Sequence, residues 1–351
     1  MRTRPKARVA YATRVRTVFA AALKVKMANW PQGDYLNKAI ENRVPASTAQ
    51  AAWNQANATQ QRGLPAVLTL AHLCKMADVS CKSMRAIVGR EVSDPYRTFQ
   101  VRKRGNAKSY RNISVPKPDL LRMQRWIDQA ILSELSAHSS ARAYSTSSSI
   151  FAAAKEHSGS TWLIKLDVRR FFESISEIQV YHVFLSAGYQ PLVAFQMARI
   201  CTRVVVSKKR YRRQRWRSSP SRYKLFDCHR VGHLPQGAPT SPRLSNLTSK
   251  TVDENFSFLA TFHGLTYSRY ADDIFLSAFS EFSRELSCEV VRDGFEILRG
   301  VGLRPHTMKT RVCGPGCRKI VLGLCVNEPT PRLTRDFKNR SLQPLRQYNY
   351  V

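Results

Sequence analysis

The sequence has 351 residues, of which 57 are Lys or Arg and 24 are Asp or Glu, so its formal net charge is +33 at neutral pH. A chain of this length can bury one large core or two to three smaller ones, and a hydrophobic content of 43% is typical of a globular protein. So large an excess of positive charge repels itself unless a polyanion neutralises it, which favours nucleic acid as the partner. No stretch of about 18 apolar residues is present, so the sequence predicts no membrane-spanning segment and no membrane partner.

The eight cysteines are scattered along the chain without the paired spacing of a structural zinc site. A chain of this size does not need disulfides to hold its fold, and no segment resembles a secretory leader. We therefore expect reduced thiols and a cytoplasmic protein.

The first part of the chain divides by composition into two regions. Residues 1–62 are interpreted as a basic arm followed by a polar extension, because residues 1–26 carry eight basic side chains and no acid. A solvated tail or an organellar transit peptide is the alternative for this arm. Residues 63–160 are predicted to be a helical region with a basic hairpin. Helical spacing of apolar residues runs from Leu64 to Val88, strand-like alternation surrounds Gly105 and Asn106 between Thr98 and Val115, and an amphipathic helix is expected over Leu120–Leu135.

Residues 161–327 are predicted to be an α+β domain built on an antiparallel sheet. The run TWLIKLD has the pattern of a buried strand and ends in Asp167. A second hairpin is expected over Leu265–Ser277, where apolar residues flank two adjacent acids, and a helix and a short strand are expected over Phe282–Gly300 and Ile320–Asn327.

A basic insert occupies residues 207–224 of this domain, and aromatic residues are interspersed among its positive charges. Such a run can contact phosphates and stack on bases, whereas a solvated charged loop is the alternative. The residues expected to bind nucleic acid are Lys208, Lys209, Arg210, Arg212, Arg213, Arg215, Trp216 and Arg217.

Three acids stand in strand-like contexts of a chain that is poor in acids: Asp167, Asp272 and Asp273. A buried carboxylate is costly unless it is paired or binds a metal. A salt bridge with Arg169 or Arg269 is the simpler explanation. Two Mg²⁺ ions held by these acids, with the Val168 carbonyl as a further ligand, would instead suit phosphoryl transfer from a nucleoside triphosphate.

Three motifs together resemble the palm motifs of reverse transcriptases: DVRRFF at 167–172, LPQGAPTSP at 234–242 and YADD at 270–273. The run PQGAPTSPRLSNL is especially similar to the retron and group II intron branch of that family, and the resemblance extends over about residues 64–327. It implies a right-hand polymerase fold with a helical N-terminal region, fingers, an antiparallel palm and a thumb, of which residues 328–351 would be a short remnant.

The resemblance also implies roles for matching residues. Asp167, Asp272 and Asp273 would be the catalytic acids, and the ring of Phe172 would exclude a 2′-hydroxyl or, alternatively, be an ordinary core side chain. The other residues expected to bind the incoming nucleotide are Lys103, Arg104, Arg111, Gln236, Gly237 and Lys309.

By the same resemblance the chain would be an RNA-directed DNA polymerase with deoxynucleoside triphosphates, a structured non-coding RNA and its DNA product as partners. A branched RNA–DNA product (msDNA), antiphage defence and an effector protein are implied by the retron likeness. The retron motif Asn-Ala-x-x-His lacks its Asn here, since Ala153 precedes Ala154 and His157, and Val321, Leu322 and Gly323 replace Val-Thr-Gly. Two alternatives remain: a defence-associated enzyme that polymerises without a template, and a catalytically silent RNA-binding scaffold.

Overall fold

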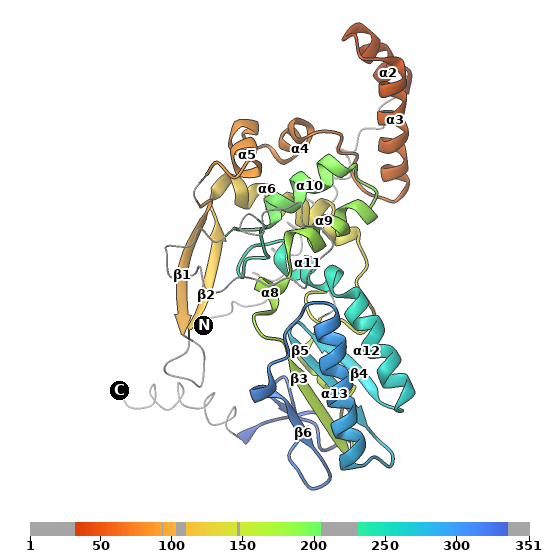
Figure 1. Ribbon diagram of the computed structural model, residues 1–351, viewed down its shortest axis with the longest axis vertical. Coiled ribbons are helices and arrows are strands. Elements are labelled where there is room, and N and C mark those ends of the chain that lie inside the picture. Colours follow the sequence, from red (N-terminus) through yellow and green to blue (C-terminus); the bar gives the residue numbers. More distant parts are fainter. Residues whose placement is uncertain (1–31, 93, 103–109, 146–147, 205–230, 336–351) are drawn as a thin grey trace, which may run out of the picture. The chain divides into compact units, whose positions relative to one another are not determined.

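The computed structural model describes residues 32–92, 94–102, 110–145, 148–204 and 231–335 (Figure 1). The chain forms two compact units that alternate along the sequence. The first contains the described residues of Met1–Ser136, Glu177–Val206 and Pro235–Ser241, and the second contains those of Ala137–Ser176, Ser207–Leu234 and Pro242–Val351.

The first unit is mainly helical. Its helices are α2 (Gln32–Glu41), α3 (Ala46–Gln61), α4 (Leu70–Ala77), α5 (Cys81–Val88), α6 (Pro118–Ala130), α9 (Glu177–Ser186) and α10 (Pro191–Cys201), with a short 3₁₀ turn η1 (Leu132–Glu134) after α6. The helical spacing between Leu64 and Val88 is confirmed as α4 and α5, which begin at the side-chain caps Thr69 and Ser80. The polar stretch before them, for which no element was predicted, contains α2 and α3.

The basic hairpin of the first unit is confirmed as β1 (Tyr96–Arg102) and β2 (Tyr110–Pro116), which pair antiparallel from Tyr96↔Pro116 to Arg102↔Tyr110. Its tip lies outside the described residues. Buried Gln124 on α6 donates to the Tyr96 hydroxyl at 3.0 Å and to the Ile200 carbonyl at 2.8 Å. This amide therefore fixes α6 against both the hairpin and α10.

The second unit is built on a four-stranded antiparallel sheet in the order β4 (Thr266–Tyr270), β5 (Asp273–Ala278), β3 (Trp162–Asp167) and β6 (Arg311–Cys313). The predicted strand ending at Asp167, the hairpin and the helix after it are all confirmed. Two helices pack on the sheet, α12 (Lys250–Phe262) against β4 and α13 (Arg284–Gly300) against β3 (Figure 1). A Cβ on Gly294 of α13 would lie 2.8 Å from Leu166, so glycine permits this close approach.

On the face of the sheet opposite α12 and α13, side chains of β3 and β5 belong to a further hydrophobic cluster. It is formed by the buried residues Ala154, Leu163, Phe275, Val321 and Val326. Ala154 belongs to α7 (Ile150–Lys155), and Val321 belongs to a small sheet in the order β7 (Ile320–Val321), β8 (Leu324–Cys325) and β9 (Arg332–Leu333). Two further helices, α8 (Phe171–Ser174) and α11 (Ser241–Thr248), complete the described helices.

The single strand predicted over Ile320–Asn327 is wrong, because this segment is a tight hairpin. Val321 pairs with Leu324, and the two residues between them, Leu322 and Gly323, have φ values of +50° and +88°. A two-residue hairpin turn with φ positive at both positions reverses the chain here. The sequence does not reveal this turn, because its first residue, Leu322, continues the apolar pattern of the residues around it.

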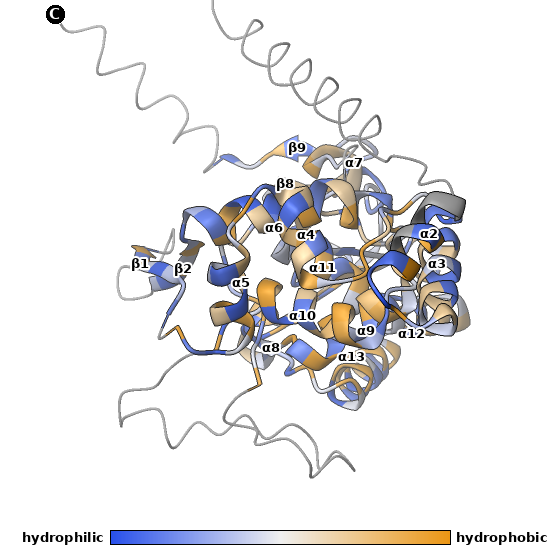
Figure 2. Ribbon diagram, turned by 90° about the horizontal axis from the view of Figure 1, so that it is seen from above, coloured by the Kyte–Doolittle hydropathy of each residue, from blue (hydrophilic) through white to orange (hydrophobic). Residues whose placement is uncertain are grey.

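The predicted α+β class with an antiparallel sheet is confirmed. In Figure 2 blue and orange residues alternate around the same helices, as expected for amphipathic helices that cover a core. Within the described residues, no helix combines the length and the apolar composition needed to cross a lipid bilayer.

Candidate active site

The three acids singled out in the sequence lie together in the second unit. Asp167 is the last residue of β3, and the register pairs it with Asp273, the first residue of β5. Asp272 occupies the two-residue turn between β4 and β5, and its carbonyl accepts a hydrogen bond of 3.1 Å from the Val168 amide. The turn is thus fastened to the end of β3, so that carboxylates 105 and more residues apart in sequence meet at one edge of the sheet.

Two lysines neutralise two of these carboxylates. Nζ of Lys309 lies 2.7 Å from Oδ2 of Asp167, and Nζ of Lys165 lies 2.8 Å from Oδ1 of Asp273. Asp272 has no ion pair among the described residues. Burial raises the pKa of the Asp272 carboxyl, and repulsion from Asp273 and Asp167 adds to this effect. The charged form of Asp272 is therefore the least satisfied of the three.

Lys309 is positioned by a segment that runs beside the end of β3. The His306 amide donates to the Asp167 carbonyl at 2.7 Å, and the Arg169 amide donates to the Arg304 carbonyl at 2.8 Å. A 3₁₀ turn, η4 (Thr307–Lys309), then directs Lys309 towards Asp167. Burial lowers the pKa of the neighbouring His306.

A metal at this edge would need ligands beyond the protein. In the described part of the chain, no three His, Cys, Asp or Glu side chains are arranged to hold a metal ion. Mg²⁺ often binds proteins through only one or two carboxylates and takes its other ligands from water and substrate phosphates. Oδ1 of Asp167 is buried without a hydrogen-bond partner. A cation shared by Asp167 and Asp272 would satisfy that oxygen and relieve the repulsion at Asp272, so the donor set fits a divalent ion of this kind.

Phe172 also belongs to the second unit and lies five residues after Asp167. It is half-buried in α8, with its ring centroid 5.7 Å from that of Phe171 and 6.3 Å from that of Tyr144. Phe171 is the buried core residue of the pair, at 4% exposure. The ring of Phe172 is therefore the more accessible of the two.

Three of the expected nucleotide-binding residues lie together in the first unit. Arg111 and Ile113 are two residues apart on β2 and therefore lie on the same face of the hairpin, where the Arg111 side chain is exposed. The turn that contains Gln236 and Gly237 lies against the same strand, because the Ser114 amide donates to the Gln236 carbonyl at 2.7 Å. A Cβ on Gly237 would lie 2.8 Å from the Ile113 side chain, so only glycine allows this approach.

The strand against which this turn lies is held in place by a partly buried arginine. Nη1 of Arg203 donates to the Ser114 hydroxyl at 2.8 Å, and Nη2 lies 2.5 Å from Oδ2 of Asp94. The position of Gln236 and Gly237 on β2 is thus set by backbone and side-chain bonds within one unit.

Other predicted residues lie outside the described part of the chain. These are the hairpin-tip residues Lys103 and Arg104, the basic insert with Lys208, Lys209, Arg210, Arg212, Arg213, Arg215, Trp216 and Arg217, and the basic arm over residues 1–26. Their roles remain predictions.

Sequence reasoning missed one basic residue of the site, and the structure gives a second a different partner. Lys165 pairs with Asp273 because it lies two residues before Asp167 on the same face of β3. Arg269, which the alternative salt-bridge explanation offered with Arg169 as a partner of these acids, instead forms a buried ion pair with Asp253 on α12. The register explains this: Tyr270 is opposite Asp273, so the preceding residue must face the other side of the sheet.

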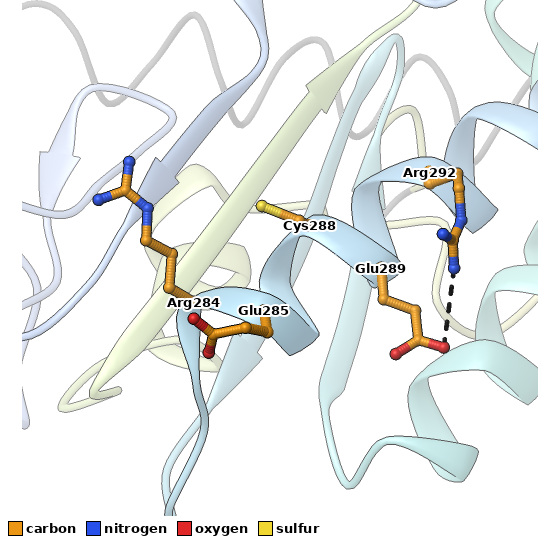
Figure 3. A pocket seen from close by; sticks show the side chains of 5 residues that line it. All are labelled: Arg284, Glu285, Cys288, Glu289 and Arg292. Atoms are coloured by element: carbon orange, nitrogen blue, oxygen red, sulfur yellow. Dashed lines mark ion pairs between the residues drawn. The ribbon is translucent and has the colours of Figure 1, made fainter.

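A surface hollow of about 720 Å³ lies along α13, lined by Arg284, Glu285, Cys288, Glu289 and Arg292 (Figure 3). Its side chains all come from one helix, and Arg292 and Glu289 form an exposed ion pair at 3.8 Å. None of the three acids lines it. We therefore do not consider this hollow the active site.

Comparisons with known proteins agree with the motifs. Residues 101–321 match the family described as Reverse transcriptase (RNA-dependent DNA polymerase). The retron Ec86 reverse transcriptase of Escherichia coli is 29% identical over 274 residues, which cover 78% of this chain and 76% of that protein. The retron Mx65 reverse transcriptase of Myxococcus xanthus is 32% identical over 270 residues, or 74% of this chain and 57% of that protein.

Solved structures give a remote likeness. A telomerase from Candida albicans in complex with a fragment of telomeric RNA has a TM-score of 0.46 at 13% identity, covering 75% of this chain and 50% of that one. A foamy viral protease-reverse transcriptase in complex with double-stranded DNA has a TM-score of 0.36 at 15% identity, covering 70% of this chain and 31% of that one. Neither likeness carries weight for function at these scores.

The family match covers more than half of the chain and contains all three acids and the turn at Gln236 and Gly237. The chain therefore belongs to the reverse transcriptases, the RNA-directed DNA polymerases, and within them to the bacterial retron type.

Proposed function

We propose that this chain copies a structured RNA into DNA, with Asp167 and Asp272 as the acids that hold two Mg²⁺ ions. The observation that carries the proposal is the register of β3 and β5, which brings Asp167 beside Asp273 and the turn of Asp272. Two observations support it: Oδ1 of Asp167 has no hydrogen-bond partner, and the pKa of Asp272 is raised. A bound cation would stabilise both carboxylates.

In this proposal Asp167, Asp272 and the Val168 carbonyl hold the ions, and Asp273 lies next to them near the primer end. Bound Mg²⁺ would neutralise charge on the attacking hydroxyl and on the leaving pyrophosphate. Nζ of Lys309 lies 2.7 Å from Oδ2 of Asp167. When the ions bind, Lys309 would leave Asp167 and pair with the pyrophosphate instead. Its ammonium group has three donors on a flexible stem, which suits such a move.

Further nucleotide contacts are proposed for residues of each unit, taken separately. Phe172, half-buried beside the acids in sequence, would exclude a 2′-hydroxyl and so select deoxynucleotides. In the first unit Arg111 would bind the triphosphate, since a guanidinium fork matches phosphate oxygens, and Gln236 and Gly237 would line the nucleotide with backbone. Lys103 and Arg104 are proposed to join Arg111 from the hairpin tip.

The biological role follows from the retron relatives by analogy. We propose that the template and primer are a structured non-coding RNA, that the product is a branched RNA–DNA molecule, and that an effector protein acts with it in antiphage defence. The net charge of +33 suits such a polyanionic partner. The seven cysteines of the described residues are free thiols, which agrees with a place in the cytoplasm.

Primer extension with the purified protein tests the proposal. Protein with its co-purifying RNA, Mg²⁺ and labelled deoxynucleotides should give DNA whose sequence is complementary to that RNA. Asp272→Asn should abolish the product, whereas Asp293→Asn, which removes an exposed acid of α13, should not. A homopolymer formed without RNA would favour the template-independent alternative, and no product under any condition would favour the silent scaffold.

A further inference from the structure

Arg269 is a fully buried arginine beside the turn that carries Asp272. It is 1% exposed and lies on β4, two residues before Ala271. Nε and Nη2 donate to Oδ1 and Oδ2 of Asp253 at 2.7 and 2.6 Å. Nη1 donates at 3.1 Å both to Oδ1 of Asn246 and to the Ala271 carbonyl. One guanidinium thus joins α11, α12 and the turn between β4 and β5.

The partners of Arg269 are themselves held by other bonds. Oδ1 of Asp253 also accepts from the Tyr267 hydroxyl at 2.7 Å, and Nδ2 of Asn246 donates to the Ala143 carbonyl at 2.8 Å. Asp253 and Asn246 are 0% and 4% exposed. Since every member has a fixed partner, the direction of the guanidinium is fixed as well.

Stability alone does not explain such a group. A buried ion pair gains little over apolar residues of the same volume, because removing two charges from water offsets their attraction. What Arg269 provides and an apolar side chain cannot is a donor aimed at one carbonyl. A planar fork with five N–H groups can hold an acid, an amide and a carbonyl in a single arrangement.

The carbonyl that Arg269 holds belongs to a strained residue. Ala271 has φ +57°, in the left-handed region that residues with a Cβ rarely adopt. Asp272 follows directly, and the turn has only these two residues between the paired Tyr270 and Asp273. Rotation of the Ala271–Asp272 peptide would change ψ of Ala271 and φ of Asp272 and so turn the Asp272 carboxylate away from Asp167, and the bond from Arg269 to the Ala271 carbonyl opposes this rotation.

We propose that Arg269 is a positioning residue for Asp272, which acts from the opposite face of the sheet by holding the Ala271 carbonyl, with Asp253 and Asn246 fixing its direction. The inference rests on the proposed function, in which Asp272 binds a metal ion. Arg269 itself touches neither nucleotide nor metal in this account.

The test compares Arg269→Lys with Tyr267→Phe. Lysine keeps the charge beside Asp253, but a single ammonium cannot also direct donors to Asn246 and Ala271. Phenylalanine removes one bond to Asp253 and leaves the fork and the turn intact. Residues that orient metal ligands change metal affinity or activity by about 10 to 100-fold when they are replaced. We expect a loss of this size in kcat and in Mn²⁺ affinity for Arg269→Lys, an unchanged KM for deoxynucleotide, and near wild-type values for Tyr267→Phe.

A metal-free measurement separates positioning from catalysis. The Val168 amide donates to the Asp272 carbonyl, so its hydrogen exchange reports whether the turn stays fastened to β3. Exchange should become faster in Arg269→Lys and stay slow in Tyr267→Phe. If Arg269→Lys does not fold, Asn246→Ala, which removes one partner of the guanidinium, should show the same changes to a smaller degree.

Wild-type exchange at Val168 together with wild-type Mn²⁺ affinity in the folded variant would overturn the inference. So would equal losses in Arg269→Lys and Tyr267→Phe, because these would indicate a general loss of packing. Absence of polymerase activity in the wild-type protein, with the exchange difference still present, would refute the proposed function and leave the positioning role of Arg269 intact.

Discussion

Replacement of Gly237 by alanine tests how the turn that is proposed to contact the nucleotide is built. Gly237 has φ +110°, and a Cβ there would lie 2.8 Å from the Ile113 side chain and 3.1 Å from the Ser114 carbonyl oxygen. Backbone strain at such a φ costs about 1 to 3 kcal/mol. Forcing a methyl group into a packed contact costs about 1 to 3 kcal/mol more. We therefore expect Gly237→Ala to destabilise the first unit by about 2 to 6 kcal/mol, or to displace the turn from β2.

Gly264→Ala is the matched control. Gly264 also has a positive φ, +64°, but its Cβ would meet no atom within 4 Å. This variant should therefore lose only the cost of the left-handed conformation, about 1 to 2 kcal/mol. The difference between the two variants isolates the close approach of the turn to Ile113 and Ser114.

Hydrogen exchange and kinetics should report the same displacement. The Ser114 amide donates to Gln236 at 2.7 Å, so its exchange should accelerate in Gly237→Ala and remain slow in Gly264→Ala. In primer extension, Gly237→Ala should raise the KM for deoxynucleotide, because the turn is proposed to contact it. Equal stability, Ser114 exchange and KM in the two variants would refute the argument from close packing.

Three further predictions concern the acids and the bound nucleic acid. Burial and repulsion from the neighbouring acids raise the pKa of Asp272, so the folded chain binds the carboxyl proton of Asp272 more tightly than the unfolded chain does. The stability of the fold therefore falls as the pH rises from the ordinary Asp pKa through the raised value. Metal-free Asp272→Asn, which is expected to be inactive, should thus melt at a higher temperature than the wild type at neutral pH, with the gap closing in acid; a lower melting temperature at neutral pH would contradict this. Phe172→Val should let ribonucleotides compete with deoxynucleotides in extension assays, and unchanged discrimination would return Phe172 to a purely structural role. Neutralising the basic insert at Arg212, Arg213 and Arg215 should flatten the salt dependence of RNA affinity measured by filter binding, and an unchanged slope would exclude phosphate contacts there.

Strands and hairpins of the second unit were predictable because their sequence pattern and their burial coincide. TWLIKLD is apolar enough to be a central strand, and its acid stands at the end, where the structure has it. The polar helix α3 was not predictable in this way. Ala46–Gln61 has few large apolar residues, and its buried side chains are the small Ala49, Ala56 and Thr59. Periodicity of large apolar residues cannot detect a helix that packs through small ones.

The candidate acids were predictable from their rarity and their strand context, but their partners were not. Asp253, the partner of Arg269, lies on α12, and nothing local in the sequence marks it as buried. His157 is a similar case. It belongs to the motif that resembles the retron Asn-Ala-x-x-His pattern, and it is 0% exposed, with its ring nitrogens 2.8 and 2.7 Å from the hydroxyls of Ser277 and Ser268. Burial lowers the pKa of His157 to about 4, so the neutral ring fastens α7 to the sheet.

The two faces of the sheet carry different ion pairs at the edge where the three acids meet. Lys165, Asp167 and Asp273 share one face, where two ion pairs at 2.7 and 2.8 Å leave the carboxylates partly neutralised by flexible ammonium groups. The lysine side chains of these pairs reach solvent, at 53% exposure for Lys309 and 28% for Lys165, so a divalent cation can displace them from the carboxylates. Arg269 and Asp253 lie on the other face, fully buried and joined by two hydrogen bonds, an arrangement that solvent cannot loosen. In the proposed function, ion pairs that a cation can displace on one face and a fixed network on the other would allow Asp272 to keep its place while its neighbours exchange partners.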